Sequence, residues 1–221
     1  RLGPMRVTQA GLVSSAAIRN ATVVVFGLAF LIGMYLVYRG GWPIAIIGLL
    51  SILFGVLYTS GPFPLAYIGI ADLFVLIFFG PVAVGGTYYV QTLRITDTVI
   101  IAGLAPGLFS VAILTVNNLR DIASDRQANK RTLAVRLGAG YARGQYVFSV
   151  VLACLAPVYL YIAGDAPVYA LIATATIVPA AFAIHDVFVR SGRSLNDSLA
   201  ATGRLLLIYS LLFSFGWLVW T

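Results

Sequence analysis

The segment "TVNNLRDIASDRQANKRTLAVRLG", residues 115–138, carries an unusual share of the charge of this chain. It holds two of the seven acidic residues and five of the fourteen basic residues in 221. Apolar runs lie on both sides of it. The segment therefore marks a polar site or loop inside an otherwise apolar protein.

The composition of the whole chain is that of a membrane protein. Hydrophobic residues make up 61% and charged residues 10%, and the mean hydropathy is +0.98. So few charges cannot cover a water-soluble surface. Continuous apolar runs of about 17 to 23 residues suit helices that cross a bilayer. The sequence therefore predicts an all-α integral membrane bundle with seven transmembrane helices, at 17–38, 42–58, 70–90, 98–116, 144–163, 167–189 and 201–220.

The distribution of lysine and arginine predicts how this bundle is oriented. With the N-terminus inside, the outer loops carry only Arg39 and Arg94. Positive residues near helix ends stay on the cytoplasmic side, because their translocation is disfavoured. We therefore expect the quoted segment to face the cytoplasm. The residues on inner segments are Arg1, Arg6, Arg19, Arg120, Arg126, Lys130, Arg131, Arg136, Arg143, Arg190, Arg193 and Arg204.

The net charge of +7 does not indicate a nucleic-acid partner. The basic residues lie along one membrane face with no aromatic stacking platform among them, so topology and anionic lipid headgroups explain them. Cys154 is the sole cysteine, which excludes an intrachain disulfide, and we expect it to be a small buried core residue. Membrane lipids are thus the partners that composition predicts.

Asn117, Asp121 and Asp125 follow one another at intervals of four residues. On a helix each step turns by about 40° and climbs about 6 Å, so the three side chains form one stripe of oxygen atoms, here called the acidic stripe. Such oxygens suit a hard cation, and Mg²⁺ is usually held by one or two carboxylates, waters and substrate phosphate. We predict that the stripe lies at the mouth of the bundle and binds Mg²⁺ with a diphosphate.

Basic residues follow the stripe directly. Arg126, Lys130 and Arg131 can take the phosphate oxygens that a metal leaves over. The alternative interpretation is a solvated cytoplasmic loop, in which these bases fix the topology and Asp121 and Asp125 reduce their mutual repulsion. The apolar span that runs into the stripe without Gly or Pro favours the site, because polar residues at such depth are usually functional.

The pattern N-x-x-x-D-x-x-x-D followed by "KRTLAVRLG" resembles the second aspartate-rich motif of the UbiA superfamily of intramembrane prenyltransferases. Within the superfamily, "YTSGPFPLAYIGIADLFVLIFFGPVAVGGTYYVQT", from Tyr58 to Thr92, is similar to the members that act on 1,4-dihydroxy-2-naphthoate in menaquinone synthesis. The stretch "GPMRVTQAGLVS" near the start shows the same similarity. The resemblance covers nearly the whole chain.

This resemblance implies a UbiA-type helical bundle and a particular reaction. A polyprenyl group passes from polyprenyl diphosphate to 1,4-dihydroxy-2-naphthoate with Mg²⁺ as cofactor, and loss of CO₂ leaves demethylmenaquinol. The expected location is the bacterial cytoplasmic membrane, with the mouth of the active site on the cytoplasmic side. The metal is assigned to Asn117, Asp121 and Asp125, of which the two aspartates are also catalytic. The donor diphosphate is assigned to Lys130 and Arg131 and, by position, to Arg126 and Arg6.

The sequence departs from the family at its start. A first aspartate-rich motif normally precedes an "R-x-G-P-x-R-L"-like stretch, whereas "RLGPMRV" begins this chain. We interpret residues 1–221 as one transmembrane prenyltransferase domain that lacks two of nine expected helices and the first motif. Because one stripe is expected to hold only one Mg²⁺, we expect residues 1–221 alone to insert without catalysing transfer. Adding the upstream segment is expected to restore activity.

Other residues have predicted roles around this site. Asp72, at the start of the third span, can orient or deprotonate an acceptor hydroxyl as a catalytic residue, or pair with an arginine. The uncharged connection at 59–69 is either a rigid cap over the site or an ordinary interfacial turn. Ser194 and Asp197 predict a capping box at the start of the last helix. A kink and close helix approach are predicted in the third span by Gly80, Pro81, Gly85 and Gly86.

Three alternatives remain from sequence alone. The acceptor can be homogentisate, 4-hydroxybenzoate or a chlorophyllide, as in other UbiA-type enzymes. A membrane transporter also has several helices and a cationic mouth, although no inverted repeat is visible here. A noncatalytic relative that keeps the fold is the third.

Overall fold

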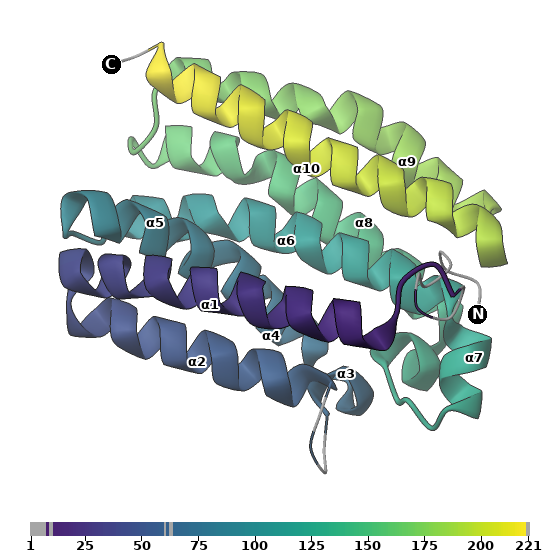
Figure 1. Ribbon diagram of the computed structural model, residues 1–221. Coiled ribbons are helices and arrows are strands. Elements are labelled where there is room, and N and C mark those ends of the chain that lie inside the picture. Colours follow the sequence, from purple (N-terminus) through teal and green to yellow (C-terminus); the bar gives the residue numbers. More distant parts are fainter. Residues whose placement is uncertain (1–7, 9–10, 60, 62–63, 220–221) are drawn as a thin grey trace.

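The computed structural model describes residues 8, 11–59, 61 and 64–219. The regular structure in these residues is helical throughout, with no strand among them (Figure 1). The elements are α1 (Ser15–Gly40), α2 (Trp42–Thr59), α3 (Leu65–Ile68), α4 (Ala71–Ile77), η1 (Phe78–Val82), α5 (Ala83–Thr92), α6 (Asp97–Arg120), α7 (Ile122–Gln127), α8 (Leu133–Ile162), η2 (Val168–Thr176), α9 (Ile177–Val189), η3 (Gly192–Ser194) and α10 (Leu195–Leu218).

The seven predicted spans all correspond to helices. Within the part of the chain that the structure describes, six helical segments are long and apolar enough to cross a membrane, and the shorter apolar helix Trp42–Tyr58 corresponds to the seventh span. The fifth span begins earlier than expected, because α8 starts at Leu133 and bends at Gly138, where φ is 87°. The predicted all-helical membrane bundle is confirmed.

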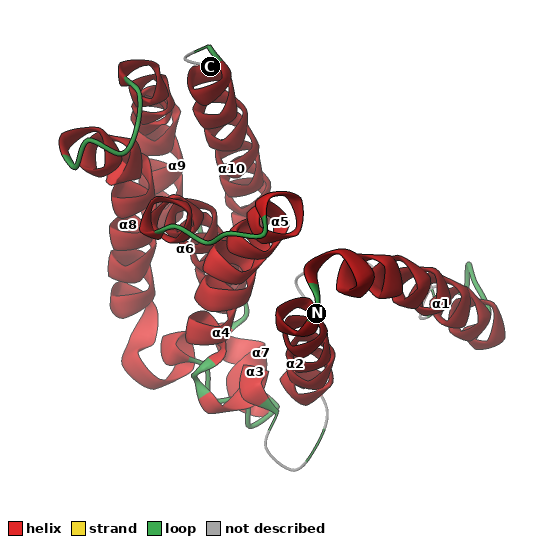
Figure 2. Cartoon of the chain, turned by 90° about the vertical axis from the view of Figure 1, so that its left-hand side faces the viewer, coloured by secondary structure: helices red, strands yellow, loops and turns green. Residues whose placement is uncertain are grey.

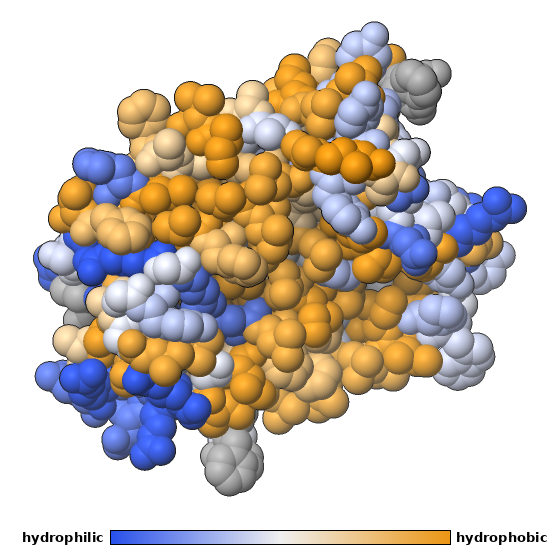
Figure 3. Space-filling model, turned by 180° about the vertical axis from the view of Figure 1, so that it is seen from behind, coloured by the Kyte–Doolittle hydropathy of each residue, from blue (hydrophilic) through white to orange (hydrophobic). Residues whose placement is uncertain are grey.

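Polar and apolar residues separate along the bundle. Figure 1 shows α3, α7 and the start of α10 at one end, and the end of α10 at the other. Figure 3 shows hydrophobic residues over the middle of the molecule and hydrophilic residues concentrated at the end that holds α7. Arg39, in the last turn of α1, donates to the Gln91 carbonyl oxygen at 3.5 Å, at the opposite end. Most of the charged residues thus lie at the α7 end of the bundle, and the arginines predicted to lie outside, Arg39 and Arg94, lie at the other end.

Helix α6 is the centre of the fold. Its buried face includes Phe109 and Val116, and α8 and α10 pack against it with Tyr146, Cys154 and Tyr209. The Tyr146 hydroxyl lies 2.9 Å from Thr202 Oγ1, so this buried polar pair is satisfied inside the bundle. Cys154 is buried, as predicted. Helix α1 lies at the margin of the bundle, beyond α2 and away from α8 and α9 (Figure 2).

The predicted kink in the third span is present. Gly80 has φ −108° and ψ −110° inside η1, and Pro81 follows it, so the helix bends there. The bend brings the backbone of this span against α6: a Cβ atom on Gly107 would lie 2.6 Å from the Leu76 carbonyl oxygen and 3.0 Å from Gly80 Cα. A Cβ atom on Gly86 would meet nothing within 4 Å. Close packing therefore requires Gly107 and not Gly86.

Gly107→Ala is expected to destabilise the protein by about 1–3 kcal/mol, because the added methyl group must push two backbones apart. Gly86→Ala is the matched control. It lies in a helix with open space around it, so it is expected to be neutral or to stabilise by up to about 1 kcal/mol. Thermal unfolding of both variants in the same detergent checks the difference, and equal midpoints would contradict the packing argument.

The expected capping box of the last helix is displaced. Ser191 and Ser194 form it around η3, while Ser194 makes no side-chain cap to α10. Asp197 instead accepts a hydrogen bond from Arg190 Nη1 at 2.9 Å. The prediction of a Ser194 and Asp197 box was wrong, because a short 3₁₀ turn precedes the helix and moves the cap upstream.

Candidate active site

The acidic stripe lies where α6 passes into α7. Asp121 is the single residue between the two helices, with φ −99° and ψ 8°. The helical spacing nevertheless continues across it, because Asp121 N donates to the Asn117 carbonyl oxygen at 3.2 Å and Asp125 N donates to the Asp121 carbonyl oxygen at 2.8 Å. Asn117, Asp121 and Asp125 thus keep their successive-turn arrangement at the polar end of the bundle.

Arg120 organises the first half of the stripe. Its Nε and Nη2 donate to the two carboxylate oxygens of Asp121, at 2.8 and 2.5 Å. Nη2 also donates to Asn117 Oδ1 at 2.7 Å, and Nη1 donates to Asn196 Oδ1 of α10 at 2.7 Å. Arg120 is only 7% exposed. A buried guanidinium with all three nitrogens engaged holds its partners in one arrangement.

Lys130 organises the second half. Its Nζ lies 3.0 Å from Asp125 Oδ2, and both side chains are largely buried. The backbone explains this contact: Asn129 adopts a left-handed conformation at φ 54°, and Lys130 N donates to the Asp125 carbonyl oxygen at 2.8 Å. Such a turn closes a helix and reverses the chain. Lys130 therefore returns over the end of α7 to the stripe.

The remaining predicted phosphate ligands are more exposed. Arg126 lies on α7 and Arg131 in the connection to α8, and both are exposed to solvent. Arg131 N donates to the Tyr67 carbonyl oxygen at 2.9 Å, which fastens α3 to this connection. A Cβ atom on Gly69 would lie 3.2 Å from the Arg131 carbonyl oxygen. The described part of the 59–69 connection therefore packs against the basic segment, as a cap would; Arg6 lies outside the described residues.

Asp72 occupies the first turn of α4, at the same end of the bundle as α3. Gln145 Nε2 of α8 donates to Asp72 Oδ1 at 2.8 Å. The predicted choice was between an acceptor hydroxyl and an arginine, and the structure pairs Asp72 with an amide. The amide carries no charge, so this contact brings no cation to Asp72.

Sequence reasoning missed Arg120, Asn196 and Gln145. Arg120 was counted as a basic residue that sets the topology, although its position beside Asp121 could have indicated a pair. No local signal points to Asn196 or Gln145, since each contacts a residue more than seventy positions away. These contacts arise only when α8 and α10 pack against the rest of the bundle.

The donor set of the stripe fits a hard divalent cation. Two carboxylates and one amide supply oxygen atoms, which are the ligands that Mg²⁺ prefers. The described residues contain no cluster of three or more His, Cys, Asp or Glu side chains, so the Asn117 amide would be the third protein ligand. Each carboxylate oxygen of Asp121 has a second lone pair beyond the one that Arg120 uses, so binding to Arg120 leaves capacity for an ion.

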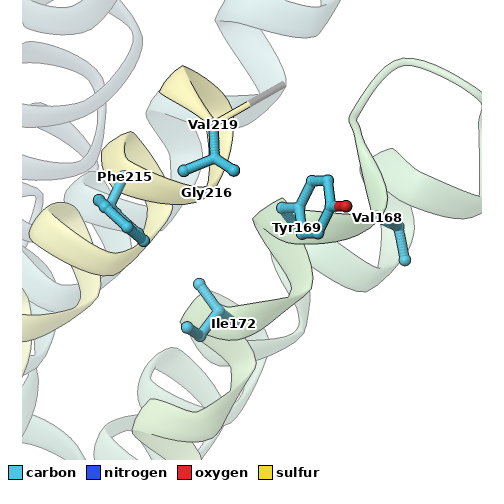
Figure 4. A pocket seen from close by; sticks show the side chains of 6 residues that line it. All are labelled: Val168, Tyr169, Ile172, Phe215, Gly216 and Val219. Atoms are coloured by element: carbon cyan, nitrogen blue, oxygen red, sulfur yellow. The ribbon is translucent and has the colours of Figure 1, made fainter. Parts of the chain in front are cut away.

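A separate apolar pocket lies at the opposite end of the bundle. It has a volume of about 230 Å³ and is formed where η2 meets the end of α10 (Figure 4). Gly216 lies twenty residues from Asn196 along α10, a separation of about 30 Å on a helix. This pocket is therefore remote from the stripe and takes no part in its chemistry. Its lining residues are Val168, Tyr169, Ile172, Phe215, Gly216 and Val219.

The chain is similar to known prenyltransferases. The UbiA prenyltransferase family matches residues 3–212. The 1,4-dihydroxy-2-naphthoate octaprenyltransferase of Haemophilus influenzae is 34% identical, across 99% of this chain and 73% of the relative. The enzyme of the same name from Mycobacterium tuberculosis is 36% identical, across 96% of this chain and 72% of the relative. That of Escherichia coli is 38% identical, across 71% of this chain and 53% of the relative.

The membrane-spanning helices and the match to the UbiA prenyltransferase family identify an integral membrane enzyme that transfers prenyl groups. The chain belongs to the UbiA prenyltransferase family. The resemblance to members that act on a dihydroxynaphthoate is confirmed by the relatives named above. A transporter without enzymatic activity is not supported.

Proposed function

We propose that this protein transfers a polyprenyl group from polyprenyl diphosphate to 1,4-dihydroxy-2-naphthoate, with Mg²⁺ as cofactor. The observation that carries the proposal is the junction of α6 and α7, where three side chains with oxygen ligands and two cations lie at the polar end of an apolar bundle. The names of the relatives support this acceptor and a long-chain donor. Residues 1–221 are taken to belong to one transmembrane prenyltransferase domain.

The donor end of the site is assigned to the stripe and the basic segment after it. Asn117, Asp121 and Asp125 would hold Mg²⁺. Bound Mg²⁺ would neutralise charge on the diphosphate as the allylic carbon–oxygen bond breaks. Lys130 and Arg131 would bind the phosphate oxygens, because a fixed cation is most effective where charge develops. Further cations for the diphosphate would come from Arg126 and Arg6.

The acceptor end is assigned to Asp72, which Gln145 holds in place at 2.8 Å. The carboxylate of Asp72 would accept a hydrogen bond from an acceptor hydroxyl and so orient the electron-rich ring. The prenyl C1 atom forms its new bond at the ring carbon that bears the carboxylate. That carboxylate leaves as CO₂, its bonding electrons return to the ring, and the product is demethylmenaquinol. The apolar spans keep water away from the allylic cation.

The charge distribution supports a proposed location. The end of the bundle that holds α7 carries most of the basic residues, and Arg39 and Arg94 lie at the other. We assign the α7 end to the cytoplasmic face of a bacterial cytoplasmic membrane, because positive residues are retained there. The water-soluble acceptor and the diphosphate group of the donor would then reach the site from the cytoplasm.

Acceptor choice is the experiment that tests this function. The native polypeptide that contains residues 1–221 is placed in lipid nanodiscs and given octaprenyl diphosphate. Equal concentrations of 1,4-dihydroxy-2-naphthoate, 4-hydroxybenzoate and homogentisate are offered as acceptors, with Mg²⁺ or with EDTA. We expect a prenylated product without the carboxylate from the naphthoate alone, and no product in EDTA. Preference for another acceptor would refute the acceptor assignment, and full activity in EDTA would refute the metal.

Lys130→Gln and Arg131→Gln are expected to raise the KM for the prenyl diphosphate by about tenfold, with little change in the KM for the acceptor. Each variant removes one charge from the donor end while the acceptor end around Asp72 is unchanged. Arg193→Gln is the matched control for Arg131→Gln, since both arginines are exposed and Arg193 lies in η3. Steady-state kinetics with each substrate varied in turn measure the effect. A change confined to the acceptor KM would contradict the assignment.

A further inference from the structure

Asn196 connects α10 to the acidic stripe. It lies in the first turn of α10, and its Oδ1 accepts from Arg120 Nη1 at 2.7 Å across 76 positions of sequence. The other nitrogens of the same guanidinium hold Asn117 Oδ1 and both carboxylate oxygens of Asp121. Arg120 thus has Asn196 on one side and two residues of the stripe on the other.

The guanidinium group transmits orientation because it is flat and rigid. Its donors project in one plane at fixed angles, so an acceptor at Nη1 restricts the directions of Nε and Nη2 as well. Arg120 is 7% exposed, so water cannot readily replace a lost partner at this depth. Without Asn196 the guanidinium would rotate toward another acceptor and carry the side chains of Asn117 and Asp121 with it.

We propose that Asn196 is a positioning residue of the active site, which acts through Arg120 to hold the oxygens of Asn117 and Asp121 in the arrangement that binds the divalent cation. The proposal rests on the function proposed above. Partners behind metal ligands commonly change metal affinity or activity by about 10–100-fold. Asn196 would occupy that position although it belongs to the last helix of the bundle.

Docking of α10 does not depend on this contact. Leu195, Leu205 and Tyr209 are buried against the core, and Tyr209 packs on Phe109 with ring centroids 5.4 Å apart. Arg190 also ties the start of the helix through Asp197. A change at Asn196 is therefore expected to alter the stripe while α10 stays in place.

The test compares Asn196→Leu, which removes the acceptor, with Asn196→Asp, which keeps an oxygen at the same position. Asp197→Asn is the control, because it changes the next residue and breaks only the exposed pair with Arg190. Mn²⁺ binding to each purified full chain is measured by electron paramagnetic resonance. Hydrogen–deuterium exchange of residues 117–127 is measured in EDTA, and the Mg²⁺ dependence of kcat is recorded in parallel.

We expect Asn196→Leu to weaken Mn²⁺ binding by about tenfold and to raise exchange in residues 117–127. Asn196→Asp and Asp197→Asn are expected to stay close to wild type in both measurements. Asn196→Ser, whose hydroxyl is too short to reach Arg120, serves as a second variant and is expected to behave like Asn196→Leu.

The positioning role would be overturned if Asn196→Leu and Asn196→Ser both showed the hydrogen–deuterium exchange and the Mn²⁺ affinity of the wild type. The proposed function would stand in that case as long as the wild-type protein is active. Equal defects in Asn196→Asp and Asn196→Leu would also overturn it, since the acceptor oxygen would then be irrelevant. If the wild type neither binds Mn²⁺ nor transfers a prenyl group, the proposed function fails. Even if the proposed function failed, unchanged hydrogen–deuterium exchange in the Asn196 variants would show that the contact with Arg120 does not order residues 117–127.

Discussion

Asp121→Ala and Asp121→Asn are both expected to lower kcat by at least about 100-fold at saturating Mg²⁺. Asp121 lies at the centre of the stripe, between Asn117 and Asp125, so it can reach an ion together with either neighbour. The asparagine variant keeps the shape of the side chain and loses its charge. It also leaves Arg120 without its anionic partner, so shape alone cannot rescue the site.

Asp97→Asn is the matched control for this prediction. Asp97 is an exposed carboxylate in the first turn of the same helix, at the end remote from the stripe. We expect its removal to leave kcat unchanged and to cost less than about 1 kcal/mol of helix stabilisation. Turnover is measured after both variants are shown to insert into the membrane. Near wild-type turnover by either Asp121 variant would mean that the metal lies elsewhere.

Arg120→Met is expected to destabilise the metal-free protein by about 3–5 kcal/mol, because it leaves the carboxylate of Asp121 buried without a cation. The Arg120 side chain is 5% exposed and that of Asp121 is 17% exposed, so solvent replaces little of the lost charge. Added Mg²⁺ is expected to recover part of the loss, since the ion would bring positive charge to the same oxygens. The midpoint of thermal unfolding in EDTA measures the destabilisation, and the midpoint in Mg²⁺ measures the recovery.

Arg190→Met is the control for Arg120→Met. Arg190 also contacts two carboxylates, Asp186 at 3.0 Å and Asp197 at 2.9 Å, but the Asp197 side chain is 77% exposed. Such pairs contribute at most about 1 kcal/mol and are not expected to respond to Mg²⁺. If Arg120→Met were as stable as Arg190→Met in EDTA, the buried pair would not have the importance assigned to it here.

The membrane-spanning helices could be predicted from the sequence with good accuracy. Every backbone polar group in a bilayer must be bonded within the span, so an apolar run of sufficient length becomes a helix whatever its neighbours are. The kink at Gly80 was predictable for a similar reason, because Gly and Pro change the backbone locally. The start of α8 was not predictable in this way, since its first turn, from Leu133, contains Arg136 and precedes the bend at Gly138.

The candidate site could be predicted only in part. The interval of four residues from Asn117 to Asp121 to Asp125 predicts a stripe, and the structure keeps that arrangement across the junction. The partner of each stripe residue was not predictable. Lys130 is assigned to the diphosphate, and the sequence did not indicate that the left-handed turn at Asn129 also brings it to Asp125.

The sequence alone determined which segments cross the membrane, which end gathers the charge and which three side chains lie on successive turns. These are properties of about twenty consecutive residues at most, and they follow from transfer free energy and helix geometry. Only the tertiary structure decided that Arg120 would meet Asn196 and that Asp72 would meet Gln145. Those contacts depend on how closely and at what height helices from distant parts of the chain pack together, and no pattern within a single helix specifies this.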